Sequence, residues 1–230
     1  MKRTQLVWLA VVICLCAASA AHAQMGVNFF KKPNIADIFK PVVGNGSAYE
    51  MQRTGKDAKQ SLEMSIVGKE SVDGKEAYWM EVGHPDEKSG TMAYAKMLIT
   101  KSDFQFHKMV FQQPGQPAME MPFHPEQMNM AGKHAESELE KWSLVGTESI
   151  TVPAGTFSCQ HWKKNEGVGD VWVSDKVSPL GMIKSVQPNE TMVLTKVITD
   201  AKDHITGPVR QFDPMAMRQQ MMQQMQKQKP

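Results

Sequence analysis

The sequence SLEMSIVGKESVDGKEAYWMEV, residues 61–82, carries the clearest indication of secondary structure in this chain. Leu62, Met64 and Ile66 alternate with polar residues, so an extended strand places the apolar side chains on one face and the polar ones on the other. Asp73-Gly74 separates this run from a second apolar run at 77–82. Asp-Gly between two alternating runs favours a two-residue hairpin turn. The stretch therefore predicts an antiparallel β-hairpin with one buried face.

The same alternation continues on both sides of the hairpin. Runs bounded by turn residues lie at 48–54, 61–67, 77–82, 91–100 and 105–112, and again at 142–152, 156–164, 170–174, 182–186 and 191–201. These runs predict a mainly β protein (β with minor α), built as a single curved antiparallel sheet or half-barrel with short terminal helices.

The remaining segments predict the domain organisation. We expect residues 24–46 to form an N-terminal helical or extended segment, because helical apolar spacing ends there at Pro41. The antiparallel β domain spans 47–205 and contains a Met- and Pro-rich connection at 113–134. Residues 206–230 are rich in Gln and Met, and we expect a C-terminal helix or tail there.

Residues 1–23 have the pattern of an export signal. Lys2 and Arg3 precede an apolar run at 6–18, which is too short for a comfortable membrane span. Ala21 and Ala23 supply the small side chains that a signal peptidase requires. We therefore expect residues 1–23 to be a signal peptide, cleavage after Ala23, and a periplasmic or secreted protein.

Composition narrows the possible partners. The chain has 26 Lys and Arg residues and 24 Asp and Glu residues. Loss of Lys2 and Arg3 with the signal makes the formal net charge zero. Because the basic residues are not clustered, we expect no nucleic acid partner. No second apolar run is long enough to span a bilayer, so no transmembrane anchor is predicted. Cys159 is the only thiol after residue 23, which leaves no intrachain disulfide in the mature chain.

Three short motifs follow one another in the second half of the chain: VPAGTF at 152–157, DVWVS at 170–174 and PLGMIK at 179–184. Pro153 and Gly155 favour a tight turn between two strands, and Pro179 and Gly181 repeat this arrangement. The motifs therefore have a structural explanation of their own.

The order of these motifs, within 148–185, resembles a pattern found in a family of exported bacterial β-sheet proteins of unknown function. Those proteins are similar to the half-barrel carriers that handle lipoproteins and lipids in the periplasm. The resemblance implies a half-barrel fold and a role in binding a lipid or other apolar ligand. It names no catalytic residue.

Cys159 and His161 invite comparison with a thiol nucleophile and its base. On a strand, residues two apart point the same way but stand about 7 Å from each other, which is beyond hydrogen-bond reach. We therefore expect Cys159 to be a buried, unreactive side chain on the strand face that also carries Phe157 and His161.

Methionine is concentrated in the two segments that least resemble strands, 113–134 and 214–225. Unbranched, polarizable side chains suit a surface that repacks around apolar ligands of variable shape. The candidates for lining such a ligand groove are Met119, Met121, Phe123, Met128, Met130, Met217 and Met221. Thioether and imidazole groups also bind Cu(I). The alternative metal site consists of Met119, Met121, His124, Met128 and Met130.

Familiar catalytic motifs are missing from the sequence. It contains no Gly-x-Ser-x-Gly elbow, no His-Glu-x-x-His motif and no phosphate-binding Walker loop. We therefore expect an exported, non-enzymatic protein without a cofactor, which binds or carries a lipid or other apolar ligand in the cell envelope. Periplasmic Cu(I) binding is the alternative function. The sequence predicts no particular protein partner.

Overall fold

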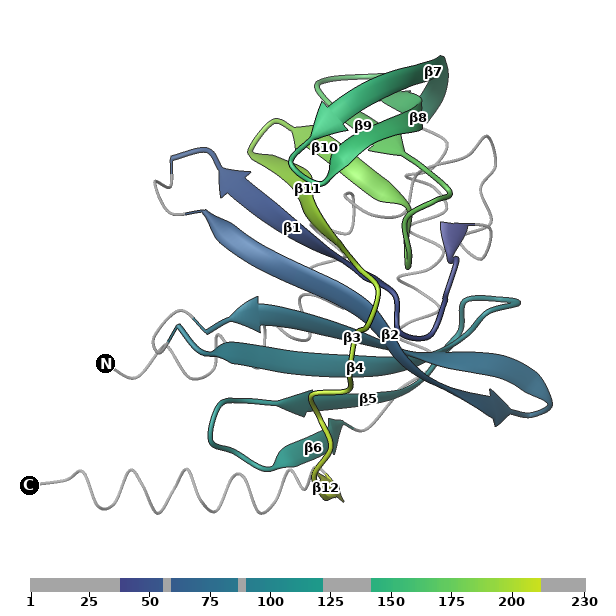
Figure 1. Ribbon diagram of the computed structural model, residues 1–230, viewed down its shortest axis with the longest axis vertical. Helices are drawn as coiled ribbons and strands as arrows, with labels where there is room; N and C mark the ends of the chain where they lie inside the picture. Colours follow the sequence, from purple (N-terminus) through teal and green to yellow (C-terminus); the bar gives the residue numbers. More distant parts are fainter. Residues whose placement is uncertain (1–37, 56–58, 87–89, 122–141, 212–230) are drawn as a thin grey trace, which may run out of the picture.

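A computed structural model of the 230-residue chain describes residues 38–55, 59–86, 90–121 and 142–211. These residues form one open, curved sheet of twelve strands (Figure 1). The strands are β1 (Gly46–Arg53), β2 (Gln60–Val72), β3 (Lys75–Pro85), β4 (Met92–Thr100), β5 (Phe106–Gln112), β6 (Ala118–Met121), β7 (Trp142–Val152), β8 (Gly155–Lys164), β9 (Asp170–Val173), β10 (Met182–Gln187), β11 (Glu190–Ile198) and β12 (Val209–Gln211). The predicted mainly β class and half-barrel architecture are confirmed.

The order of the strands in the sheet is β12-β6-β5-β4-β3-β2-β1-β11-β10-β9-β8-β7. Two meanders, β1 to β6 and β7 to β11, are therefore joined side by side through the antiparallel pair β1 and β11. At the β2–β3 turn, Asp73 and Gly74 have φ values of 50° and 78°. Positive φ at both central residues is what a type I′ hairpin requires, and this confirms the turn that Asp-Gly predicts.

Two strands lie in segments that the sequence does not predict to be strands. β6 forms within the predicted 113–134 connection, and β12 forms within the predicted C-terminal helix or tail, 206–230. β12 pairs with β6 in parallel, whereas every other pair in the sheet of the described residues is antiparallel. The other predicted helical stretches lie outside the described residues, apart from the last few residues before β1.

The main core lies on one face of the sheet, here called the inner face, and draws residues from both meanders. Phe39 is fully buried there and contacts Tyr78 and Phe104 edge-on, with ring centroids 6.3 Å and 5.2 Å away. The turn between β7 and β8 folds back toward β11, where the Ala154 amide donates to the Leu194 carbonyl at 3.4 Å. Three strands separate β7 from β11 in the sheet, so this contact requires strong curvature.

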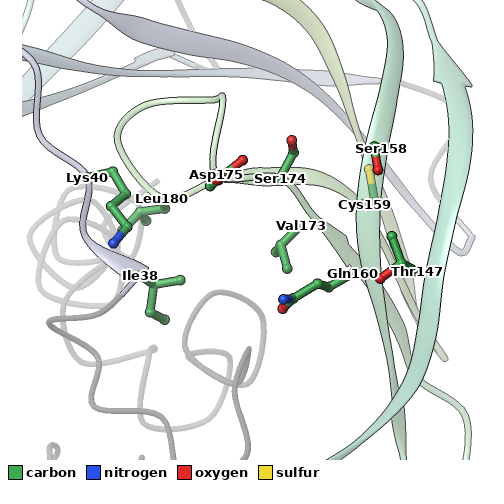
Figure 2. Close-up of a pocket in the computed structure, with 11 residues that line it drawn as sticks. Ile38, Lys40, Thr147, Ser158, Cys159, Gln160, Val173, Ser174, Asp175 and Leu180 are labelled. Carbon is green, nitrogen blue, oxygen red and sulfur yellow. The ribbon is translucent and has the colours of Figure 1, made fainter.

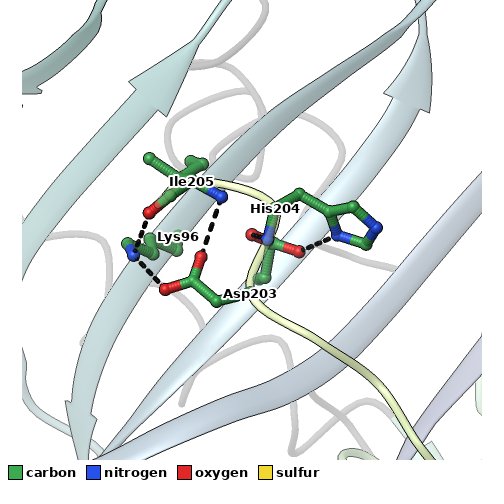
Figure 3. A network of polar contacts seen from close by, with 5 residues as sticks. Lys96, Asp203, His204 and Ile205 are labelled. Carbon is green, nitrogen blue, oxygen red and sulfur yellow. Dashed lines mark hydrogen bonds and ion pairs between the residues drawn. The ribbon is translucent and has the colours of Figure 1, made fainter. Parts of the chain in front are cut away.

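The outer face carries a smaller apolar cluster of Val110, Ala118 and Ile205. Ile205 belongs to residues 199–208, here called the strap, which leads from β11 across the outer face to β12 (Figure 1). The Lys96 ammonium donates to Asp203 Oδ2 at 2.5 Å and to the Ile205 carbonyl at 2.8 Å (Figure 3). The strap explains how the chain reaches the far edge of the sheet and adds a parallel strand there.

A second contact of the strap involves the carboxylate of Glu81, which is almost fully buried. It accepts hydrogen bonds from the His204 backbone amide at 3.1 Å and lies 2.6 Å from the His204 ring nitrogen Nδ1. The His204 ring also stacks on Tyr94, with the centroids 4.2 Å apart. Burial is the largest effect on the pKa of Glu81 and raises it, while the bonds from His204 lower it in part.

Candidate functional site

A pocket of about 250 Å³ opens where the segment before β1 meets the second meander (Figure 2). One wall comes from the segment at 38–40 and from β9 with the loop that follows it. The other wall is the β7–β8 hairpin. The pocket is lined by Ile38, Lys40, Thr147, Ser158, Cys159, Gln160, Val173, Ser174, Asp175, Leu180 and Gly181.

The loop wall, residues 174–181, is shaped by a close approach between its two ends. The Ser174 amide donates to the Gly181 carbonyl at 2.8 Å, and the Gly181 amide donates to the Val177 carbonyl at 2.8 Å. Gly181 has a φ of 70°, and a Cβ added to it would lie 2.8 Å from the Ser174 carbonyl oxygen. Glycine is therefore required at position 181 both for its backbone conformation and for the space it leaves.

Two hydrogen bonds attach the segment at 38–40 to this loop. The Lys40 amide donates to the Pro179 carbonyl at 2.9 Å, and the Ser178 hydroxyl donates to the Lys40 carbonyl at 3.0 Å. Burial of Ile38 and Phe39 holds the same segment against the core. As a result, the Lys40 side chain is held beside the pocket although 133 residues separate it from Val173 in sequence.

The hairpin wall is a regular antiparallel pair, in which Thr147 lies opposite Gln160 and Glu148 opposite Cys159. Cys159 is 1% exposed, which confirms the predicted burial, and its thiol donates to the Phe157 carbonyl at 3.5 Å. Burial raises the pKa of the thiol to about 11, with a further contribution from the Glu148 carboxylate. The thiol is therefore protonated at neutral pH and is a poor nucleophile.

His161 is engaged by other side chains than Cys159. Its ring nitrogens lie 2.9 Å from Glu148 Oε1 and 2.8 Å from Asp170 Oδ1, and its ring stacks on Trp172 at 4.5 Å. Phe157, which shares the predicted strand face, is only partly buried. On the strand face that these three residues were predicted to share, Cys159 is thus deeply buried, whereas Phe157 and His161 are partly exposed.

Ser174 contributes a buried hydroxyl that no other described residue engages. The residue is 5% exposed, and its Oγ makes no hydrogen bond within the described part of the chain. Of the side-chain atoms in this condition, which also occur on Ser47, Ser185, Gln187 and Glu190, only the Ser174 Oγ belongs to a residue that lines the pocket. Leaving such a group without a partner costs about 1–3 kcal/mol, so a ligand atom that bonded to it would recover part of that free energy.

The lining as a whole suits an amphipathic molecule. Ile38, Val173 and Leu180 offer apolar contact, whereas Gln160 and the hydroxyl groups offer hydrogen bonds. Lys40 and Asp175 add one charge of each sign. Among the described residues, no group of three or more His, Cys, Asp or Glu side chains is placed to hold a metal ion.

The predicted methionine groove falls largely outside the described residues, which contain only Met119 and Met121 of its seven members. These two lie in β6 opposite Phe111 and Met109, and Met121 packs against the main core. Neither lines the pocket. Phe123, His124, Met128, Met130, Met217 and Met221 lie outside the described residues, and so does most of the alternative metal site.

The sequence does not predict the pocket, although two of the motifs in the second half of the chain contain residues that line it. Ser174, Leu180 and Gly181 belong to the DVWVS and PLGMIK motifs, which turn chemistry alone explained. The signal that was available is the polar Ser174 at the end of a buried strand. Lys40 carried no signal, because only the tertiary fold brings it to this loop.

Comparison with known proteins adds similarities of shape. No protein-family model matches the chain, and no curated protein matches it. A protein described as exported, with a YmcC-like fold, from Bacteroides fragilis has 14% sequence identity and a TM-score of 0.41, over 70% of this chain and 98% of the other. A protein described as a lipoprotein from Parabacteroides distasonis has 12% identity and a TM-score of 0.37, over 70% and 97%. MucB has 13% identity and a TM-score of 0.37, over 69% and 54%. These partial overlaps carry no argument about what this chain binds.

Proposed function

We propose that this protein is exported and binds a lipid or other apolar ligand in the cell envelope, without catalysing a reaction. The observation that carries the proposal is the pocket, in which apolar side chains lie beside a buried hydroxyl that has no partner among the described residues. The sequence of residues 1–23 supports export, to the periplasm or outside the cell.

The size of the pocket limits how much of a ligand it holds. A volume of about 250 Å³ lies below the roughly 300–1,000 Å³ of pockets that enclose drug-sized ligands. One head group or a short length of lipid chain fits, and the rest of a lipid extends beyond the pocket.

No helix in the described residues is long and apolar enough to cross a membrane.

The chemistry of the pocket favours binding over catalysis. Its thiol is protonated at neutral pH, since burial raises the pKa of Cys159 to about 11. The nearby histidine, His161, is held between two carboxylates and lies outside the pocket lining. The described lining thus offers hydrogen bonds and apolar contacts, and its thiol is not an activated nucleophile.

Native mass spectrometry of the protein, exported with its own signal and purified without detergent, tests the proposal. We expect an additional mass on the wild-type protein, and lipid in an organic extract of it. Leu180→Asn should reduce the lipid-bound fraction, because it replaces an apolar side chain in the pocket lining. Leu144→Asn is the matched control, since Leu144 is 49% exposed and lies outside the pocket.

The outcomes separate clearly. Loss of the bound mass in the folded Leu180→Asn variant alone supports the proposal. A wild-type protein that carries no apolar molecule, and takes none up when mixed with envelope lipids, contradicts it. Equal binding by the two variants contradicts the assignment of the ligand to this pocket.

A further inference from the structure

We infer that the pocket recognises a zwitterionic head group, in which an ammonium and an anionic group lie a few bonds apart, as in phosphoethanolamine. The inference rests on the proposed function and names the polar end of the ligand. It follows from the two charges at the pocket, from the buried Ser174 hydroxyl and from the apolar side chains next to them.

Lys40 and Asp175 are the two charged residues in the pocket lining. Neither side chain has a hydrogen bond or an ion pair with any of the residues that the structure describes. Their backbones are held near each other, because Lys40 is bonded to Ser178 and Pro179 in the loop that begins at Ser174. The pocket therefore presents one free positive and one free negative charge from a fixed framework (Figure 2).

This pair of charges discriminates between head groups. A purely anionic group can pair with Lys40 but is repelled by Asp175 in the same lining, and a purely cationic group can pair with Asp175 but is repelled by Lys40. Repulsion between like charges is unfavourable and selects against the wrong ligand. A zwitterion satisfies both residues at once, with its anionic group on Lys40 and its ammonium on Asp175.

Ser174 adds a contact that surface charges alone do not provide. Its hydroxyl is buried, has no partner within the described residues and can donate one hydrogen bond. An anionic oxygen that reached this hydroxyl would accept that bond, and the Gln160 amide on the opposite wall is a second donor in the lining. Ile38 and Leu180 are available to the first methylene groups beyond the head.

Isothermal titration calorimetry of the full exported chain tests the inference with four probes. These are O-phosphoethanolamine, dihexanoyl phosphatidylethanolamine, dihexanoyl phosphatidylglycerol and dihexanoylglycerol, with the lipids kept below their micelle-forming concentrations. We expect the phosphatidylethanolamine to bind about tenfold more tightly than the phosphatidylglycerol, because only the former supplies an ammonium for Asp175. Free phosphoethanolamine should bind more weakly, since it lacks the apolar contacts.

Matched variants identify the residues that are responsible. Asp175→Asn should bring the affinity for phosphatidylethanolamine down to that for phosphatidylglycerol, and Lys40→Gln should weaken the binding of both phospholipids. Ser174→Ala should weaken both as well, by several-fold. Lys176→Gln and Asp200→Asn are the controls, because both residues are exposed and lie outside the pocket lining. They should leave all four affinities unchanged.

The probes also separate this inference from the proposed function. If dihexanoylglycerol or phosphatidylglycerol binds as tightly as phosphatidylethanolamine, the head-group inference is wrong and the apolar function stands. If phosphoethanolamine binds and no lipid improves on it, the head is recognised as a free solute and the apolar function is wrong. If no probe binds to the folded protein, both are wrong.

Discussion

Gly181 sets the shape of the pocket at the scale of one residue. A side chain there would meet the Ser174 carbonyl oxygen at 2.8 Å, in a backbone conformation with a φ of 70°. The left-handed conformation alone costs a non-glycine residue about 1–2 kcal/mol. Gly181→Ala should therefore lower the free energy of unfolding by more than this, because the collision adds to the conformational cost.

Urea titrations of Gly181→Ala and Gly167→Ala separate the conformational cost from the cost of the collision. Gly167 has a φ of 85°, and a Cβ there would meet nothing within 4 Å. Its loss of stability should stay near the conformational cost of about 1–2 kcal/mol. Equal losses in the two variants would show that the contact between Gly181 and Ser174 contributes nothing to stability.

Cys159 provides a second test at the residue scale. Because burial raises the pKa of its thiol to about 11, thiolate is scarce in the native state at pH 8. Labelling by a maleimide or a disulfide reagent should be slow there, and much faster after unfolding in urea. Rapid labelling of the native protein at pH 8 would contradict the burial of this side chain.

The strap is the element whose contribution is most easily isolated. Ile205 is 2% exposed and packs with Val110 and Ala118, so Ile205→Ala should lower the free energy of unfolding by about 2–5 kcal/mol. Val209→Ala is the control at an exposed site nearby, with an expected change below about 0.5 kcal/mol. Chemical denaturation followed by tryptophan fluorescence measures both, and similar small changes would mean that the strap does not hold β12 in place.

Individual elements show what the sequence could and could not predict. Ten of the twelve strands follow from apolar alternation, and the β2–β3 turn follows from Asp73-Gly74. β6 was missed because the prolines on both sides of it, Pro117 and Pro122, are typical of a connection. β12 was missed because three residues are too few to display a period of two. Their parallel pairing depends on the strap, whose anchors Glu81 and Lys96 lie in distant strands.

Less of the pocket than of the sheet could be predicted from the sequence. The burial of Cys159 follows from strand periodicity, and the turn at Gly181 follows from glycine and proline chemistry. The convergence of Lys40, Gln160 and Ser174 depends on the curvature of the sheet and on the two hydrogen bonds that Lys40 makes with Pro179 and the Ser178 hydroxyl, which no local pattern encodes. The methionine hypothesis relied on composition alone, and its described members, Met119 and Met121, lie in β6 and outside the pocket lining.

At the scale of the whole molecule, two meanders joined through β1 and β11 make one curved sheet. Its inner face is filled by the core, to which the second meander and the segment before β1 both contribute. The pocket lies where these two parts meet, so ligand binding should stabilise the contact between them. A ligand bound there should raise the melting temperature of the wild-type protein and have less effect on Leu180→Asn.

The most direct measurement is a methyl NMR titration of the full exported chain with dihexanoyl phosphatidylethanolamine. We expect saturable shifts of the Ile38, Val173 and Leu180 methyl signals, because these side chains line the pocket. The exposed methyl groups of Leu144 and Val209 lie outside it and should not shift. Shifts at Leu144 or Val209 with none at Ile38, Val173 and Leu180, or no saturable shift at all, would contradict the claim that this pocket is the ligand site.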